Sequence, residues 1–155
     1  MDNLPTLESI QILYQLLLAV GLGAAIGLER EFQGKPAGLR TYALVALGAC
    51  LFTIISIDGF TAFATNGNFD PARIASNVVV GIGFLGGGLI FLKGGTVRGL
   101  TTAAGLWVSA AIGVAVGVEL YWVAIFATAT SLVILIILKW FEHYIHRGHV
   151  EDVSL

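Results

Sequence analysis

Long apolar stretches separated by short polar segments dominate the chain. They run from about Ile10 to Leu28, Thr41 to Ile57, Ile74 to Leu92, Thr102 to Val118, and Leu120 to Leu138. Each holds about 17–19 residues, and a helix of that length approaches the thickness of the hydrocarbon core of a bilayer. The pattern therefore predicts an all-α membrane protein with about five transmembrane helices.

Lysine and arginine are distributed unequally between the two sets of predicted loops. One set carries Arg73 alone, and the other carries Arg30, Lys35, Arg40, Lys93, Arg98, Lys139 and Arg147. Because short loops rich in Lys and Arg stay in the cytoplasm, we expect the N-terminus outside and the C-terminus inside. The predicted domains are a transmembrane domain over residues 1–139 and a short cytoplasmic tail over residues 140–155.

The composition agrees with membrane insertion. Hydrophobic residues make up 57% of the chain and charged residues 12%, whereas roughly 25% of residues are charged in soluble domains. The net charge of −2 gives no reason to expect a nucleic-acid partner. Cys50 is the single cysteine and lies in an apolar stretch, so no disulfide framework is expected.

Two parts of the chain resemble each other. Gly23 and Gly27 in the first apolar stretch correspond to Gly83 and Gly87 in the third, and a Gly-Leu-x-Thr sequence follows in both parts. Both copies read as a helix, a glycine-rich loop and a second helix, crossing the membrane in the same direction. The similarity predicts a parallel two-helix internal repeat, with units of about 15–52 and 75–113 followed by a fifth helix.

The spacing of Gly81, Gly83 and Gly86 matches a dinucleotide-binding turn, but the surrounding sequence does not. Such a turn follows a strand and precedes a carboxylate by about 20 residues, whereas these glycines lie in an uncharged stretch. In a membrane, small residues four apart let another helix approach closely. We therefore predict a homo-oligomer through glycine faces, with helix-packing roles for Gly23, Gly27, Gly81, Gly83 and Gly87.

The two loops expected in the cytoplasm contain most of the charged and hydroxyl side chains. They read EREFQGKPAGLRT and KGGTVRGLTT. The threonine hydroxyls could cap the helices that follow. Glu29 either faces water or has an ionic partner, and Arg40 or Arg98 could reach it. The sequence predicts a cytoplasmic-side polar site made of Glu29, Arg30, Arg40, Thr41, Arg98, Thr101 and Thr102.

Few polar residues are expected at membrane depth. Asn77 is the candidate intramembrane polar residue, and no ionisable residue falls near a predicted midplane, where proton-coupled carriers usually keep one. Magnesium could still cross along backbone carbonyls and water, because it keeps much of its hydration shell. Glu29, His143 and His146 are weak metal-ligand candidates. We predict no cofactor other than a magnesium ion, and no enzyme, since no nucleophile and base are brought together.

Three motifs together resemble the membrane domain of a known family. The sequences GLGAAIGLERE followed by GKPAGLRTYALVALGACLF, then GIGFLGGGLIF and VRGLTTAAGLWVSAAIG, are similar to those of the MgtC/SapB family. The resemblance covers roughly residues 10–140 and implies a multi-pass protein of the bacterial plasma membrane, linked to growth in low magnesium and to virulence. Longer members continue into a cytoplasmic domain.

The resemblance also implies a function. It implies a regulatory or adaptor role in adaptation to low magnesium or acid stress, acting through membrane-protein partners, with the ATP synthase as one such partner. The alternative is a transporter of magnesium or another small solute that uses the glycine-rich helix repeat. No catalytic role comes with the family pattern.

Overall fold

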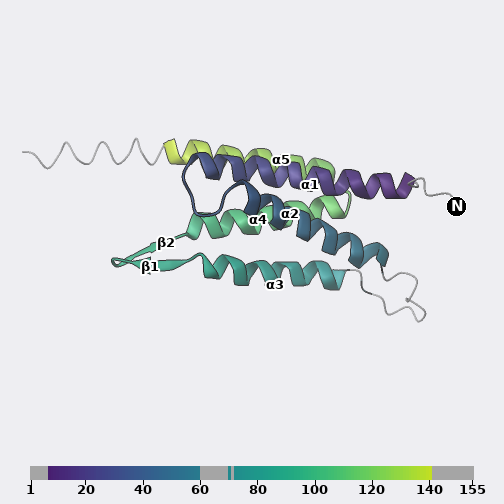
Figure 1. Cartoon of the computed structure of the whole chain (residues 1–155), viewed down its shortest axis with the longest axis horizontal. Helices are drawn as coiled ribbons and strands as arrows, with labels where there is room; N and C mark the ends of the chain where they lie inside the picture. The colour runs from purple at the N-terminus through teal and green to yellow at the C-terminus, as the bar shows by residue number, and fades with distance from the viewer. Residues whose placement is uncertain (1–6, 60–69, 71, 141–155) are drawn as a thin grey trace, which may run out of the picture.

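Five helices and one small hairpin make up the part of the chain that the computed structural model describes, residues 7–59, 70 and 72–140 (Figure 1). The elements are α1 (Leu7–Phe32), α2 (Leu39–Ile54) continued by the π-helical η1 (Ile55–Gly59), α3 (Ala72–Gly88), β1 (Phe91–Lys93), β2 (Thr96–Arg98), α4 (Leu100–Gly117) and α5 (Tyr121–Val133) continued by the π-helical η3 (Ile134–Leu138). Four of these helical segments, all but α3, are long and apolar enough to cross a membrane. The predicted all-α membrane fold is confirmed.

Successive helices run in opposite directions, so the chain returns repeatedly to the same end of the bundle. Figure 1 shows the α1–α2 connection, the hairpin and the end of α5 at one end, opposite the start of α1. We call this the basic end, because its residues include Lys35, Arg40, Lys93, Arg98 and Lys139. The distribution of positive charge predicts that the basic end faces the cytoplasm.

The centre of the bundle is the contact between α2 and α4, where small residues on α4 recur every fourth position. A Cβ atom added at Gly113 would press against the backbone oxygen of Ala46, and one at Gly117 would lie 2.7 Å from the Cβ of Thr53. Residues four apart share a helix face, so the small side chains form one continuous row against α2. The row consists of Gly105, Ser109, Gly113 and Gly117. It was not among the predicted packing positions.

α1 also packs on α2 through glycine. A Cβ atom at Gly23 would lie 2.7 Å from the Cβ of Ala46, and one at Gly27 would lie 2.8 Å from the Cα of Leu39. Both helices therefore approach more closely than larger side chains would allow. Gly23 and Gly27 therefore lie at a close helix–helix contact, as their four-residue spacing predicts.

The glycines of α3 are placed differently. A Cβ atom at Gly81, Gly83 or Gly87 would meet nothing within 4 Å, and it is Gly86 that faces α4, with its added Cβ 3.5 Å from the Cβ of Ala103. Gly81, Gly83 and Gly87 therefore have no packing partner among the described residues of the chain. Contact with a second copy through this face stays a prediction.

α3 ends at Gly88, earlier than the predicted boundary at Leu92. Three successive glycines weaken the end of the helix, since each costs about 1 kcal/mol relative to alanine. The chain then forms the antiparallel hairpin β1–β2, with Phe91 opposite Arg98. Gly94 and Gly95 have φ values of 60° and 78°, as a two-residue hairpin turn requires. We had expected a glycine-rich loop without strands here.

Gly99 joins the hairpin to α4 and has a φ of 90°. A Cβ atom there would press against the backbone oxygen of Leu89. We expect Gly99→Ala to lower the free energy of unfolding in detergent micelles by about 1–3 kcal/mol, because the side chain adds strain to this backbone conformation. Gly21→Ala is the control: its Cβ meets open space within a helix, so stability should stay equal or rise. Equal effects of the two substitutions would contradict the strain argument.

Candidate functional site

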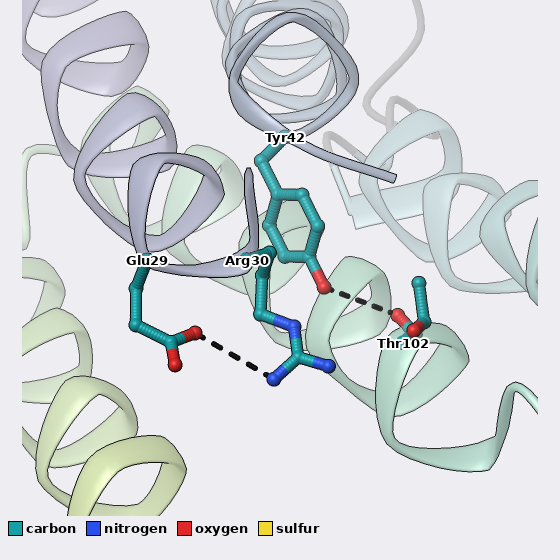
Figure 2. Close-up of polar contacts among 4 residues, drawn as sticks. All are labelled: Glu29, Arg30, Tyr42 and Thr102. Atoms are coloured by element: carbon teal, nitrogen blue, oxygen red, sulfur yellow. Dashed lines mark hydrogen bonds and ion pairs between the residues drawn. The ribbon is translucent and has the colours of Figure 1, made fainter. Parts of the chain in front are cut away.

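Two adjacent charged side chains near the end of α1 are buried. Arg30 is 4% exposed and Glu29 9% exposed, and Nη1 of Arg30 lies 3.5 Å from Oε2 of Glu29 (Figure 2). Removing an ion from water costs several kcal/mol, and a partner of opposite charge offsets much of that cost. The pair lies at the basic end of the bundle, within one helical turn of Phe32, where α1 ends.

Side chains and backbone from two other helices surround the ion pair. Tyr42 of α2 is fully buried, and its hydroxyl donates a hydrogen bond to the backbone oxygen of Thr102 of α4 at 3.3 Å. Figure 2 shows the Arg30 side chain alongside Tyr42, with the guanidinium group between Glu29 and Thr102. The site thus brings together the end of α1 and the starts of α2 and α4.

The ion pair leaves polar atoms without hydrogen bonds among the described residues. Both carboxylate oxygens of Glu29 and Nε of Arg30 are buried and have no such partner. The separation of 3.5 Å exceeds the roughly 2.7–2.9 Å of a charge-assisted hydrogen bond. Buried polar atoms are normally satisfied, so this carboxylate has capacity to accept a hydrogen bond from water or from another donor. The arrangement compensates charge and connects three helices.

The ion pair differs from the expected one. We had placed Arg40 or Arg98 as the partner of Glu29, but both arginines are exposed and Arg30 is the partner. Neighbouring residues on a helix point in different directions, so sequence spacing gives no signal for this pair. Glu29 and Arg30 meet because both side chains are long enough to bend toward each other.

The predicted threonine caps are wrong. α2 begins after Gly38 and α4 after Gly99, so the N-cap residue of each helix is a glycine, which has no side chain to act as a cap. Thr41 and Thr101 are exposed, while Thr102 is buried and contributes its backbone oxygen to Tyr42. The side chains of the three threonines therefore have no capping role at these helix starts.

A carboxylate from α1 bonds to the first amide of α2 instead. Oε2 of Glu31 accepts a hydrogen bond from the backbone amide of Leu39 at 2.9 Å. A negative charge at the N-terminus of a helix also interacts favourably with the helix dipole. Because Glu31 lies eight positions before Leu39, no local capping pattern in the sequence points to it.

Tyr42 connects α2 to α4 in a second way. Oγ of Ser109 donates a hydrogen bond to the backbone oxygen of Tyr42 at 3.0 Å. We expect Tyr42→Phe to remove the bond to Thr102, to keep the bond from Ser109, and to lower the free energy of unfolding by about 0.5–1.5 kcal/mol. Tyr14→Phe is the matched control, since the ring of Tyr14 packs edge-on against Tyr121 on the outside of the bundle. A loss as large in the control would rule out the assigned role of the Tyr42 hydroxyl.

Buried polar side chains elsewhere in the bundle bond to backbone carbonyls. Gln15 reaches the oxygen of Val116 at 3.5 Å, and the hydroxyls of Thr53 and Thr128 bond to carbonyls four residues earlier at 2.8 and 2.9 Å. Gln15, which is 4% exposed, was missed in the sequence. It occupies the face of α1 shared by Ala19 and Gly23, and this four-residue spacing is the signal that could have found it.

The metal-ligand candidates are not brought together. The described residues include no group of three or more His, Cys, Asp or Glu side chains placed to hold a metal ion. Glu29 is a single carboxylate beside a guanidinium group, which competes with a cation for the same oxygens. His143 and His146 lie outside the described residues. Asn77, the candidate intramembrane polar residue, is exposed on α3.

These features define a multi-pass helical membrane protein with an ion pair buried at one end of its helix bundle. The MgtC family model matches residues 16–144, so the chain belongs to the MgtC family. The resemblance seen in the sequence motifs is thereby confirmed.

Two relatives illustrate the extent of the similarity. The chain is 42% identical over 127 residues to "Putative magnesium transporter YhiD" of Escherichia coli strain K12, covering 81% of this chain and 59% of that protein. It is 46% identical over 118 residues to "Protein MgtC" of Brucella abortus strain 2308, covering 76% of this chain and 47% of that protein. The chain thus spans about half the length of these relatives. No solved structure matches it.

Proposed function

We propose that this chain is a regulatory or adaptor protein of the bacterial plasma membrane, acting in adaptation to low magnesium or acid stress through membrane-protein partners. The observation that supports the proposal is where the buried polar groups lie. Gln15, Thr53 and Thr128 bond to backbone carbonyls, and the buried charges of the described bundle are Glu29 and Arg30 at the basic end. An ion carrier needs ionisable or polar groups along a path at membrane depth. Here the buried hydroxyl and amide groups are engaged by the backbone and the buried charges lie at one end of the bundle, which favours a regulatory role over transport.

The exposed face of α3 supports the partner component of the proposal. Phe84 is 84% exposed, and the positions of Gly83 and Gly87 are open. Small residues beside an exposed aromatic ring allow a second helix to approach closely in a membrane. A second copy of the chain would pack here to form a homo-oligomer. A membrane partner such as the ATP synthase, which the family resemblance implies, would use the same face.

Gly83→Leu is expected to reduce both assembly and function several-fold. The change adds a side chain to the open face of α3 without a clash inside the chain, so the variant should insert and fold. The measurements are oligomer size on native gels and growth in low magnesium of a strain that lacks the gene. Gly21→Leu is the control, because its position on α1 is equally open. Normal assembly and growth with Gly83→Leu would refute this contact face.

The alternative function is transport of magnesium or another small solute. The name of the Escherichia coli relative favours it, and a magnesium ion that keeps its waters needs few protein carboxylates. Under this alternative the magnesium ion would be the cargo. The two functions differ in whether the purified protein moves magnesium by itself.

A further inference from the structure

α2 and α3 enclose a groove of about 640 Å³ on the side of the bundle, and α4 contributes one residue to its lining. Apolar side chains of α2 and α3 form most of the wall. The residues that matter for its shape and chemistry are Arg40, Gly48, Phe52, Asn77, Gly81 and Ala110.

Small residues make the groove deep. A Cβ atom at Gly48 or at Gly81 would meet nothing within 4 Å. An apolar hollow cannot hold ordered water, because water needs two to four polar partners. In a bilayer, a hydrocarbon chain is the natural occupant of such a space.

The groove has a charged mouth at the basic end. Arg40 and Thr41 lie there, and both are exposed. Across the described residues, no hydrogen bond or ion pair engages the guanidinium group of Arg40. Arginine binds phosphate through two parallel hydrogen bonds, so the mouth is complementary to a phosphate group held at the membrane surface.

The length of the groove matches one leaflet of the membrane. Its wall on α2 extends from Arg40 to Phe52, which corresponds to about 18 Å at 1.5 Å per residue. Half of a bilayer's hydrocarbon core is about 15 Å thick. A tail that begins at a headgroup on Arg40 would therefore run the length of the groove, toward Phe52 and Asn77.

We propose that this groove binds one anionic phospholipid from the leaflet at the basic end, with its phosphate on Arg40 and one acyl tail between α2 and α3. A net negative headgroup is preferred because a zwitterionic lipid would bring its ammonium group close to the guanidinium group of Arg40, and like charges repel. The inference does not depend on whether the protein is a regulator or a transporter.

Native mass spectrometry of the full chain in detergent tests the headgroup contact. The protein is titrated with phosphatidylglycerol or with phosphatidylcholine, and we expect one phosphatidylglycerol bound about tenfold more tightly. Arg40→Gln should abolish this preference. Arg98→Gln is the control, since it removes a positive charge at the same end outside the groove and should leave the preference intact. If both variants lost the preference for phosphatidylglycerol equally, the proposal would be overturned, because the overall positive charge of this end would then explain the binding.

Filling the groove tests the position of the tail. Gly48→Leu should weaken the binding of both lipids about tenfold by occupying the hollow, and Gly81→Leu on the opposite wall provides a second variant if the first does not fold. Gly21→Leu adds the same side chain on α1, outside the groove, and should leave lipid binding unchanged. Wild-type lipid binding by a folded groove-filling variant would refute the proposal. A change in the number of protein copies with lipid retention unaltered would also refute it, and would assign the groove to a second copy.

Discussion

Gly113→Leu is expected to force α2 and α4 apart and to lower the free energy of unfolding by about 3 kcal/mol or more. Any side chain at this position begins with a Cβ atom pressed against the backbone oxygen of Ala46, and 2.9 Å from the Cβ of Ala49. Both neighbouring atoms belong to the backbone or are fixed to it, so neither can move aside without shifting a helix. The substitution therefore acts on the contact that holds the centre of the bundle together.

The measurement is equilibrium unfolding in mixed micelles, with helicity followed by circular dichroism. Gly21→Leu is the matched control, because the same substitution there meets open space within the chain. Its unfolding free energy should stay within about 0.5 kcal/mol of the wild type, as at other exposed positions. If Gly113→Leu were as stable as Gly21→Leu, the arrangement of α2 against α4 would be wrong.

Arg30→Met is expected to cost about 3–5 kcal/mol, since it leaves the Glu29 carboxylate buried without its partner. Glu29 is 9% exposed and cannot recover its hydration without local unfolding. The double variant Glu29→Gln with Arg30→Met should regain much of the loss, because it removes both charges and keeps the shapes of the side chains similar. Arg98→Met, at an exposed position, should change stability by about 0.5 kcal/mol or less.

A double-mutant cycle on the unfolding free energies measures the coupling. We expect the sum of the single losses to exceed the loss in the double variant by more than about 1 kcal/mol, as for other residues that form one charge pair. Additive losses would show that Glu29 and Arg30 act independently. Rescue of a Glu29→Lys variant by Arg40→Glu, and not by Arg30→Glu, would restore the pairing first expected from the sequence.

The fold was largely predictable because the length of an apolar stretch is a strong signal in membrane proteins. Hydrophobic runs located all five helices, and the distribution of Lys and Arg separated the two ends of the bundle. The end of α3 was misplaced because the residues after Gly88 are as apolar as a helix interior. Gly94-Gly95, with Leu92 and Val97 at equal distances on either side, was the overlooked signal of a hairpin.

Packing partners were harder to predict than helices. Gly23 and Gly27 have a close neighbour in α2, whereas Gly83 and Gly87, with the same spacing, have none in the chain. Glycine spacing shows which faces permit close approach, but the topology determines which of them receive a neighbour. The row on α4 that includes Gly113 has the same spacing and was not singled out.

The contacts among the predicted site residues could be predicted only in part. Glu29, Arg30 and Thr102 gather at one end of the bundle, whereas the other four residues are exposed, and a functional role for the group stays a prediction. The identity of the ionic partner and the role of Tyr42 could not be predicted, because both depend on how three helices meet. In the sequence, Tyr42 is one aromatic residue within an apolar stretch, and nothing beside it indicates which helix it contacts.

Magnesium flux into proteoliposomes tests the proposed function most directly. Purified, folded protein is reconstituted with a magnesium-sensitive dye inside the vesicles, with and without an imposed membrane potential, and Arg40→Ala serves as the comparison variant. A regulator or adaptor should give the same flux as vesicles without protein under every condition. Saturable flux that depends on the protein and is lost in Arg40→Ala would contradict this function and would identify the chain as a transporter.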